Sequence, residues 1–202
     1  MVRLLDRGLS DVAREIAAAG FVALWDGRAA RPDELVPGSA RRVRRATAEL
    51  VDRGRAEVDD DGRVVGVHGL TLRETRHGFL HAGRLHRTWC AFDAVGIPAA
   101  LQIAADARTT CPACGRAVHV PIRGGQPEVS DVALWLPSST VRHLMADFCA
   151  AADLYCGRDH LGQRIDPARQ PGEVLDLAGA AALGRTVWAD IAALRLDGQS
   201  GR

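Results

Sequence analysis

The side chains best suited to chemistry in this sequence are a cysteine and an aspartate three residues apart, Cys90 and Asp93. The apolar stretch that follows, residues 94–101, predicts a buried helix as far as Pro98. Residues three apart share a helix face, so the thiol and the carboxylate are expected to be neighbours. Apolar surroundings raise the pKa of a carboxyl group, which makes Asp93 a candidate proton donor near neutral pH. The spacing alone also fits a simpler alternative, a capping aspartate beside an inert buried cysteine.

Residues 111–115, CPACG, form a Cys-x-x-Cys motif that is tight enough for the sulfurs of Cys111 and Cys114 to reach one metal ion. A structural zinc ion normally takes four ligands, and the sequence has no second motif of this kind. We therefore expect either a zinc site that His119 or Cys156 completes, or a dithiol that holds a soft metal transiently. A β-turn with two reduced cysteines accounts for the motif equally well.

The composition limits the setting in which these residues work. The chain has 202 residues, of which 47% are hydrophobic, so it can bury a core as one domain or two. Five cysteines are too few, and odd in number, for a secreted disulfide scaffold, so we expect thiols in the cytoplasm. We expect no membrane partner, because no apolar run approaches the roughly 18 residues of a membrane helix. Charges near Met1 argue against a signal peptide.

The N-terminal third predicts three helices followed by a β-hairpin. The first helix begins at the N-cap Ser10 and ends at Gly20. An Asp-Gly turn between two short apolar runs is typical of a hairpin. The expected ranges are residues 10–19, 32–36 and 41–53 for the helices and 56–67 for the hairpin. This order is the outline of a winged helix.

The arginine-rich third helix allows two interpretations. One is that Arg41, Arg42, Arg44 and Arg45, which lie largely on its exposed side, enter a DNA groove. The other is a solvated helix face in a fold reused as scaffold. The aspartates at the hairpin tip, residues 59–61, would repel phosphate. The net charge of +1 gives no general attraction to nucleic acid either, so we expect the scaffold role and no nucleic-acid partner.

From residue 69 onward the sequence changes to short apolar segments separated by Gly, Pro and polar turns. It lacks the alternating strand–helix rhythm of a doubly wound sheet. We predict an α+β fold in which a winged-helix-like domain, residues 1–69, precedes a catalytic domain, residues 70–202, with a mainly antiparallel or mixed sheet and packed helices. The expected strands are residues 79–80, 85–89, 117–122 and 132–136.

Two more helices are expected in the second part of the chain. Pro137, Ser138 and Ser139 predict the start of a helix whose apolar positions bring Cys149 onto its buried face or just past its end. The Ala-rich residues 175–194 predict a final packed helix. Gly184 should loosen it.

Three separated motifs give this sequence a resemblance to a known family. They are residues 69–75 (GLTLRET), residues 89–93 (WCAFD) and Phe148-Cys149, with a weaker echo at residues 182–184. In this order they look like the successive landmarks of the organomercurial (alkylmercury) lyase family. Several motifs in the right order are more specific than any one alone. The family also has an N-terminal winged-helix-like layer that serves as scaffold.

The resemblance implies that Cys90 and Cys149 are the thiols that bind mercury and that Asp93 delivers a proton to the leaving carbon. Mercury(II) is soft, and two thiolates donating to it give the attached carbon carbanion character. An unperturbed thiol has a pKa of about 8.5, so Asp93 would accept a thiol proton and then return it to carbon. The products would be a hydrocarbon and bound mercury(II), with no organic cofactor or catalytic metal required. The ion would pass to small thiols or to a mercuric reductase.

Cys114 departs from the family pattern, because it adds a thiol beside Cys111 that would retain mercury, relay it or bind zinc. Two other functions stay open from the sequence. One is a winged-helix regulator that binds soft metals and releases DNA. The other is a lyase-like metal-binding protein without turnover, since likeness of fold does not establish activity.

Overall fold

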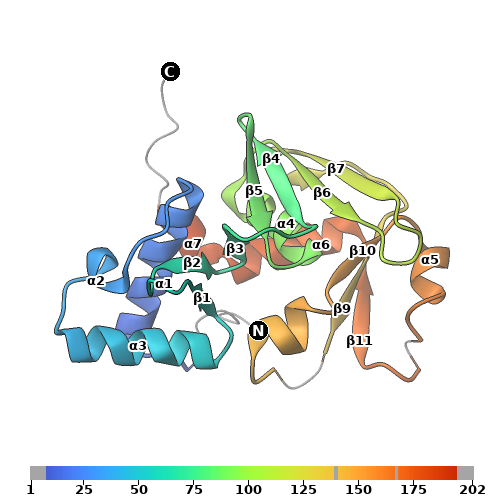
Figure 1. Ribbon diagram of the computed structural model, residues 1–202. Coiled ribbons are helices and arrows are strands. Elements are labelled where there is room, and N and C mark those ends of the chain that lie inside the picture. The colour runs from blue at the N-terminus through green and yellow to red at the C-terminus, as the bar shows by residue number, and fades with distance from the viewer. Residues whose placement is uncertain (1–7, 139–140, 167, 195–202) are drawn as a thin grey trace.

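The computed structural model describes residues 8–138, 141–166 and 168–194. It has an α+β fold built on two antiparallel sheets (Figure 1). The larger sheet has eight strands in the order β1-β2-β3-β5-β4-β6-β7-β8, and the smaller has three in the order β10-β9-β11. The predicted fold class, with a mainly antiparallel sheet and packed helices, is therefore confirmed.

The N-terminal helices are α1 (Asp11–Trp25), α2 (Pro32–Leu35) and α3 (Ala40–Asp52). Ser10 caps α1 as predicted, because its side chain accepts a hydrogen bond from the backbone N–H of Ala13. The predicted stop at Gly20 is wrong, since α1 continues to Trp25. A Cβ at Gly20 would lie 3.2 Å from Val67 Cγ1, so this glycine lets the helix pack closely on the sheet.

The predicted hairpin is present as β1 (Ala56–Val58) and β2 (Val64–Val67). The Asp59 carboxylate accepts the backbone N–H groups of Asp61 and Arg63 and so closes the turn. β2 then pairs with β3 (Leu70–Thr71), which means that the hairpin is continuous with the large sheet. The winged-helix description of this segment stays a prediction.

The rest of the large sheet contains three of the strands expected from the sequence and others that were not expected. β6 escaped prediction because its residues, ADARTT, include few large apolar side chains, although alternate positions are buried. The strands are β4 (Gly78–His81), β5 (Arg84–Thr88), β6 (Ala105–Thr110), β7 (Ala117–Arg123) and β8 (Gln126–Pro127).

The small sheet lies at the other end of the molecule from α1 and α3 (Figure 1). Its central strand is β9 (Ala133–Pro137), which confirms the last of the predicted strands. β10 (Asp153–Tyr155) and β11 (Gly172–Leu175) flank it. The short helix α5 (Arg158–Gly162) follows β10 and packs beside it.

Helix α4 (Ala91–Leu101) contacts strands of both sheets, including β4, β6, β9 and β10. Its residues 91–100 are all buried. The prediction that this helix reaches only to Pro98 is wrong, because the helix runs through the proline to Leu101. Burial on all sides holds the helix together despite the N–H that proline lacks.

The C-terminal segment forms two helices, α6 (Leu177–Val187) and α7 (Ala189–Ala193), and not the single predicted helix. The break falls at Trp188, whereas Gly184 lies within α6. A Cβ on Gly184 would lie 2.4 Å from the Cα of Gly96 in α4. Gly184 therefore marks the point where the two helices cross with their backbones in contact.

The helix predicted to lead to Cys149 is mostly absent. Only a π-helical turn, Met145–Cys149, forms there, and Ser139 lies outside the described residues. The Asp147 carboxylate accepts the N–H groups of Arg142 and His143, which holds the preceding residues in a compact loop.

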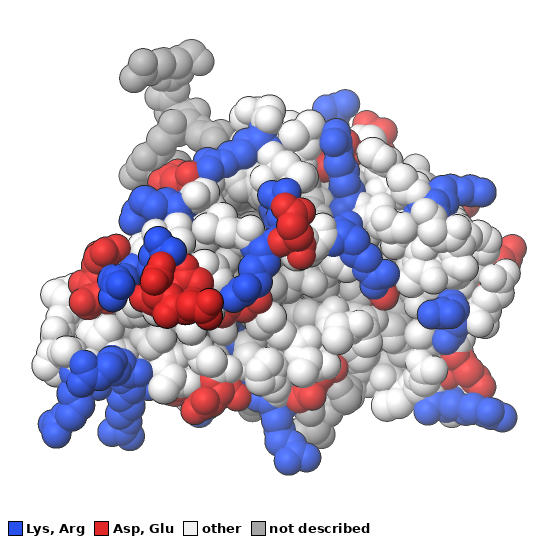
Figure 2. All heavy atoms as spheres, viewed as in Figure 1, with Lys and Arg blue, Asp and Glu red and all other residues white. Residues whose placement is uncertain are grey.

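The surface carries charges of both signs. All four arginines on α3 are exposed, and in Figure 2 basic side chains project along the edge that α3 forms in Figure 1. Acidic side chains gather close above them on the face in view. Within the described ranges no helix has the length and apolar character needed to span a bilayer.

Candidate active site

The fold brings together two cysteines and an aspartate that are far apart in sequence. The sulfurs of Cys90 and Cys149 and a carboxylate oxygen of Asp93 all lie within 4.8 Å of one another. The three residues are buried, with exposures of 0%, 8% and 4% respectively. All five cysteines of the chain are free thiols.

Helix α4 positions two of these groups at its N-terminus. Cys90 is the N-cap residue, in an extended conformation, and Asp93 lies in the first turn. The Asp93 carboxylate accepts the backbone N–H of Cys90 at 3.0 Å. The Thr88 hydroxyl donates to the Cys90 carbonyl oxygen at 3.0 Å, which fixes the entry to the helix. The neighbourhood of thiol and carboxylate expected from their spacing is therefore present, and Asp93 also has the capping role of the simpler alternative.

Cys149 comes to the site from the π-helical turn. The Ala91 N–H donates to the Ala152 carbonyl oxygen at 3.2 Å, and so joins the start of α4 to the residues after Cys149. Phe92 and Phe148 meet edge to face, with ring centroids 6.3 Å apart. These contacts hold the two cysteine-bearing segments against each other.

A tight turn before β3 shapes the space around the carboxylate. His68 and Gly69 both have positive φ, and a Cβ at Gly69 would lie 2.9 Å from the Asp93 carboxyl carbon. The Trp188 indole N–H donates to the His68 carbonyl oxygen at 2.8 Å. Glycine at position 69 thus leaves room for the Asp93 side chain.

A second set of polar contacts holds Trp89, the residue that precedes Cys90. Its indole N–H donates to Glu57 of β1 at 2.6 Å, and the Thr71 hydroxyl donates to the same carboxylate oxygen at 2.8 Å. The guanidinium of Arg73 pairs with the other oxygen of Glu57 at 3.4 Å. The residues 69–75 motif therefore supports the tryptophan beside Cys90.

A cavity of about 320 Å³ leads to this cluster. Asp93 and Cys149 line it, whereas Cys90 is fully buried. Most of the remaining wall is apolar and aromatic, with Phe92, Leu136, Val141, Leu144, Phe148, Leu183, Val187 and Trp188 among its residues. An apolar group entering the cavity would thus meet a thiol and a carboxyl group.

Burial dominates the ionisation of the cluster. It raises the pKa of Asp93 from 3.8 to about 7, although hydrogen bonds from Cys90 act in the opposite direction. Burial, the contact with Cys149 and the charge of Asp93 raise the pKa of Cys90. For Cys149 the contact with Cys90 lowers the pKa, but burial and the charge of Asp93 outweigh it, so that the pKa is raised. Near neutral pH the two thiols are therefore favoured in their neutral forms, whereas Asp93 is present both as the acid and as the carboxylate and can exchange a proton with them.

The Cys-x-x-Cys pair lies in a different place. Cys111 and Cys114 cluster with Cys156 and with His160 of α5, and all four ligand atoms lie within 4.8 Å of one another. Of the two predicted partners, Cys156 joins the cluster. His119 does not, and its ring instead lies 3.5 Å from Asp106.

His160 was missed by the sequence analysis. The signal that could have identified it is its short spacing from Cys156, because a cysteine and a histidine four residues apart can supply two ligands to one metal ion. In the structure Cys156 lies just before α5 and His160 lies within it.

Two buried thiols beside a carboxyl group, next to an apolar cavity in this α+β fold, have the chemistry of proteins that can hold a soft metal ion through thiolates. The family model for alkylmercury lyase (MerB) matches residues 70–189. The chain therefore belongs to the alkylmercury lyase family, and by family it is an enzyme acting on the carbon–mercury bond of organomercurials.

Individual relatives agree with this assignment. An alkylmercury lyase of Pseudomonas putida is 41% identical over 66 residues, which cover 33% of this chain and 31% of that protein. One from Bacillus cereus is 25% identical over 170 residues, covering 80% and 75%. A crystal structure of the mercury-bound form of MerB2 is 20% identical, covers 94% of this chain and 95% of its own, and superposes with a TM-score of 0.83. This last likeness shows that the two share a fold.

Proposed function

We propose that this protein cleaves carbon–mercury bonds by protonolysis with Cys149, Cys90 and Asp93 as its catalytic residues. The observation that carries the proposal is the convergence of their two sulfurs and one carboxylate oxygen within 4.8 Å, at the end of an apolar cavity. Two soft ligands and one proton carrier are what the reaction needs.

The depths of the two thiols support an order of events. Cys149 lines the cavity, so its sulfur takes the organomercurial first and releases its proton with the displaced ligand. Cys90 then gives its proton to the Asp93 carboxylate and forms the second sulfur–mercury bond. Asp93 returns this proton to the carbon as the carbon–mercury bond breaks, which yields a hydrocarbon and mercury(II) held by two thiolates.

The pKa of Asp93 suits both halves of this proton transfer. A carboxyl group with a pKa of about 7 exists in both forms near neutral pH, so it can accept a proton and donate it again. Its hydrogen bond from the Cys90 N–H keeps it beside the thiol that it serves.

The cavity wall favours alkyl and aryl groups as the organic part of the substrate. Leu183, Val187 and Phe92 offer contact to such groups without demanding hydrogen bonds. Cys149 also lines a second, smaller pocket with Arg73 and Glu74. We assign to this pocket the approach of a small thiol, or of a mercuric reductase, that removes the mercury(II) product.

The segment of residues 1–69 serves as scaffold in this proposal, and residues 70–202 as the catalytic domain. The continuity of β2 with β3 supports this role, because it ties the N-terminal hairpin to the sheet beside the site. Glu57 of that hairpin receives the Trp89 hydrogen bond. The acidic hairpin tip is unfavourable to DNA, and the free thiols support a cytoplasmic location.

Benzene release from phenylmercuric acetate in excess thiol tests the proposal. Asp93→Asn keeps an oxygen to accept the Cys90 N–H but removes the proton carrier, so we expect benzene release to fall by about 100- to 10,000-fold. Cys90→Ala and Cys149→Ala each remove a mercury ligand and should abolish release. Asp60→Asn, a change at the exposed hairpin tip, is the matched control and should retain full activity.

Three outcomes separate the candidate functions. Full turnover by Asp93→Asn would contradict the proton transfer. A wild-type protein that binds mercury without releasing benzene would be a binding protein with the lyase fold. Mercury-dependent release from a DNA duplex at low salt would favour the regulator.

A further inference from the structure

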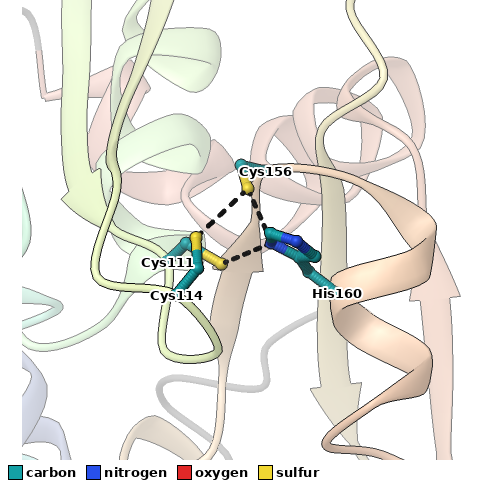
Figure 3. Close-up of side chains that lie close together, drawn as sticks. All are labelled: Cys111, Cys114, Cys156 and His160. Carbon is teal, nitrogen blue, oxygen red and sulfur yellow. Dashed lines mark hydrogen bonds between the residues drawn. The ribbon is translucent and has the colours of Figure 1, made fainter.

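The second cysteine cluster is assembled from two sheets and lies apart from the catalytic residues. Cys111 and Cys114 come from the turn between β6 and β7 of the large sheet. Cys156 and His160 come from the segment after β10 of the small sheet. Figure 3 shows the three sulfurs and the His160 ring pointing toward one common centre.

The distances within the cluster can be compared with those of a tetrahedral zinc site. With zinc–sulfur bonds of about 2.3 Å and zinc–nitrogen bonds of about 2.0–2.1 Å, a tetrahedron has sulfur–sulfur edges of about 3.8 Å and sulfur–nitrogen edges of about 3.6 Å. The Cys114 and Cys156 sulfurs are 3.7 Å apart, and the Cys111 sulfur is 3.8 Å from His160 Nδ1. The Cys156 sulfur is 3.0 Å from the same nitrogen, so this one edge must open by about 0.6 Å, which a small side-chain rotation supplies.

The turn that carries the first two sulfurs has the form of a metal knuckle. The Cys111 N–H donates to the Arg116 carbonyl oxygen, and the Gly115 N–H donates to the Cys111 carbonyl oxygen, both at 2.9 Å. Gly115 has a φ of +72°, which a side chain would disfavour. These backbone hydrogen bonds hold the Cys111 and Cys114 sulfurs on the same side of the turn even when no metal ion is bound (Figure 3).

We propose that Cys111, Cys114, Cys156 and His160 bind one structural Zn²⁺ ion. Three sulfurs and one imidazole nitrogen form a closed tetrahedral set that leaves no position for substrate, as structural zinc sites do. A metal here would join the β6–β7 turn to the segment after β10. Because β10 also connects Cys156 to Cys149, the zinc would fix one end of the segment that carries a catalytic thiol.

The same four ligands would also accept mercury, which is softer than zinc. Mercury at this cluster would displace the zinc ion and loosen the junction of the two sheets. In this proposal the cluster therefore has a structural role, and the mercury compound that is the substrate does not bind there during catalysis.

The test is the zinc content of the wild-type protein purified under reducing conditions and reconstituted with zinc chloride. We expect about one zinc ion per chain, and a cobalt-substituted protein with thiolate charge-transfer absorption and tetrahedral d–d bands. Cys114→Ser and His160→Ala should each lose most of the zinc. Cys114 is exposed, so its substitution leaves the core intact. His119→Ala is the matched control, a neighbouring histidine outside the cluster, and should keep the metal.

Thermal unfolding supplies a readout independent of metal counting. A chelator should lower the Tm of the wild-type protein by roughly 10 °C and leave the Tm of Cys114→Ser unchanged, because that variant has no zinc to lose. Wild-type protein that stays free of zinc after reconstitution would overturn the proposal. A Cys114–Cys156 disulfide that persists in protein purified under reducing conditions would also overturn it, as would zinc retained in full by both ligand variants.

Discussion

Substitution of Gly69 by alanine tests how closely the turn before β3 governs the Asp93 carboxyl group. The added methyl would lie 2.9 Å from the carboxyl carbon, whereas ordinary contact begins at 3.4 Å, so the side chain must retreat by at least 0.5 Å. A misplacement of about 1 Å at a reacting group can cost about 100-fold in rate. We therefore expect a kcat for benzene release lowered by roughly 10- to 100-fold. Both catalytic thiols stay in place, so mercury binding should persist.

The backbone of this variant is strained as well, and a control must separate the two effects. Gly69 has a φ of +90°, and a residue with a side chain in the left-handed region costs about 1–2 kcal/mol. Gly83 has a φ of +79°, but a Cβ there would have nothing within 4 Å. Gly83→Ala should therefore lose similar stability in urea unfolding and keep full kcat. If folded Gly69→Ala releases benzene at the wild-type rate, the turn does not control the carboxyl group.

Two predictions concern stability. Because the pKa of Asp93 is raised from 3.8 to about 7 in the folded protein, the folded state binds more protons in that interval and stability falls as the pH rises through it. Asp93→Asn removes this decline, so in urea unfolding the variant should be more stable than the wild type at pH 8, by on the order of a few kcal/mol. The difference in stability should shrink toward pH 4. If the stabilities of the two proteins changed in parallel with pH, the prediction would be contradicted. Gly184→Ala places a methyl 2.4 Å from the Gly96 Cα and should cost about 1–3 kcal/mol in thermal unfolding. Gly162→Ala, whose Cβ meets nothing within 4 Å, should not destabilise, and equal Tm values for the two would refute the close helix crossing.

The sequence predicted correctly those helix ends and turns that depend only on residues close together in the chain. Ser10 caps α1, and the Asp-Gly turn closes the hairpin, because both depend on hydrogen bonds between near neighbours. The errors occurred where distant contacts decide the outcome. Gly20 continues a helix because a strand lies against it, and Pro98 stays inside α4 because the surrounding core holds the helix.

The same division applies to the two clusters of chemical groups. Cys90 and Asp93 are neighbours in sequence, so their proximity could be predicted from helical spacing. The addition of Cys149 came from the family resemblance, since no local pattern links it to the other two. His160 joins Cys111 only because the two sheets meet there, and sequence spacing carries no information on that meeting.

The unequal depth of the two thiols has a consequence for the release of mercury. The ion would be shared between Cys149 on the cavity wall and Cys90 in the interior. An incoming thiol can reach only the outer sulfur–mercury bond, so exchange must proceed stepwise, and the inner bond breaks after a new sulfur is attached. Mercury(II) would then pass from one sulfur ligand to the next without ever becoming a free aqueous ion, and its residence time would depend on the concentration of the acceptor thiol.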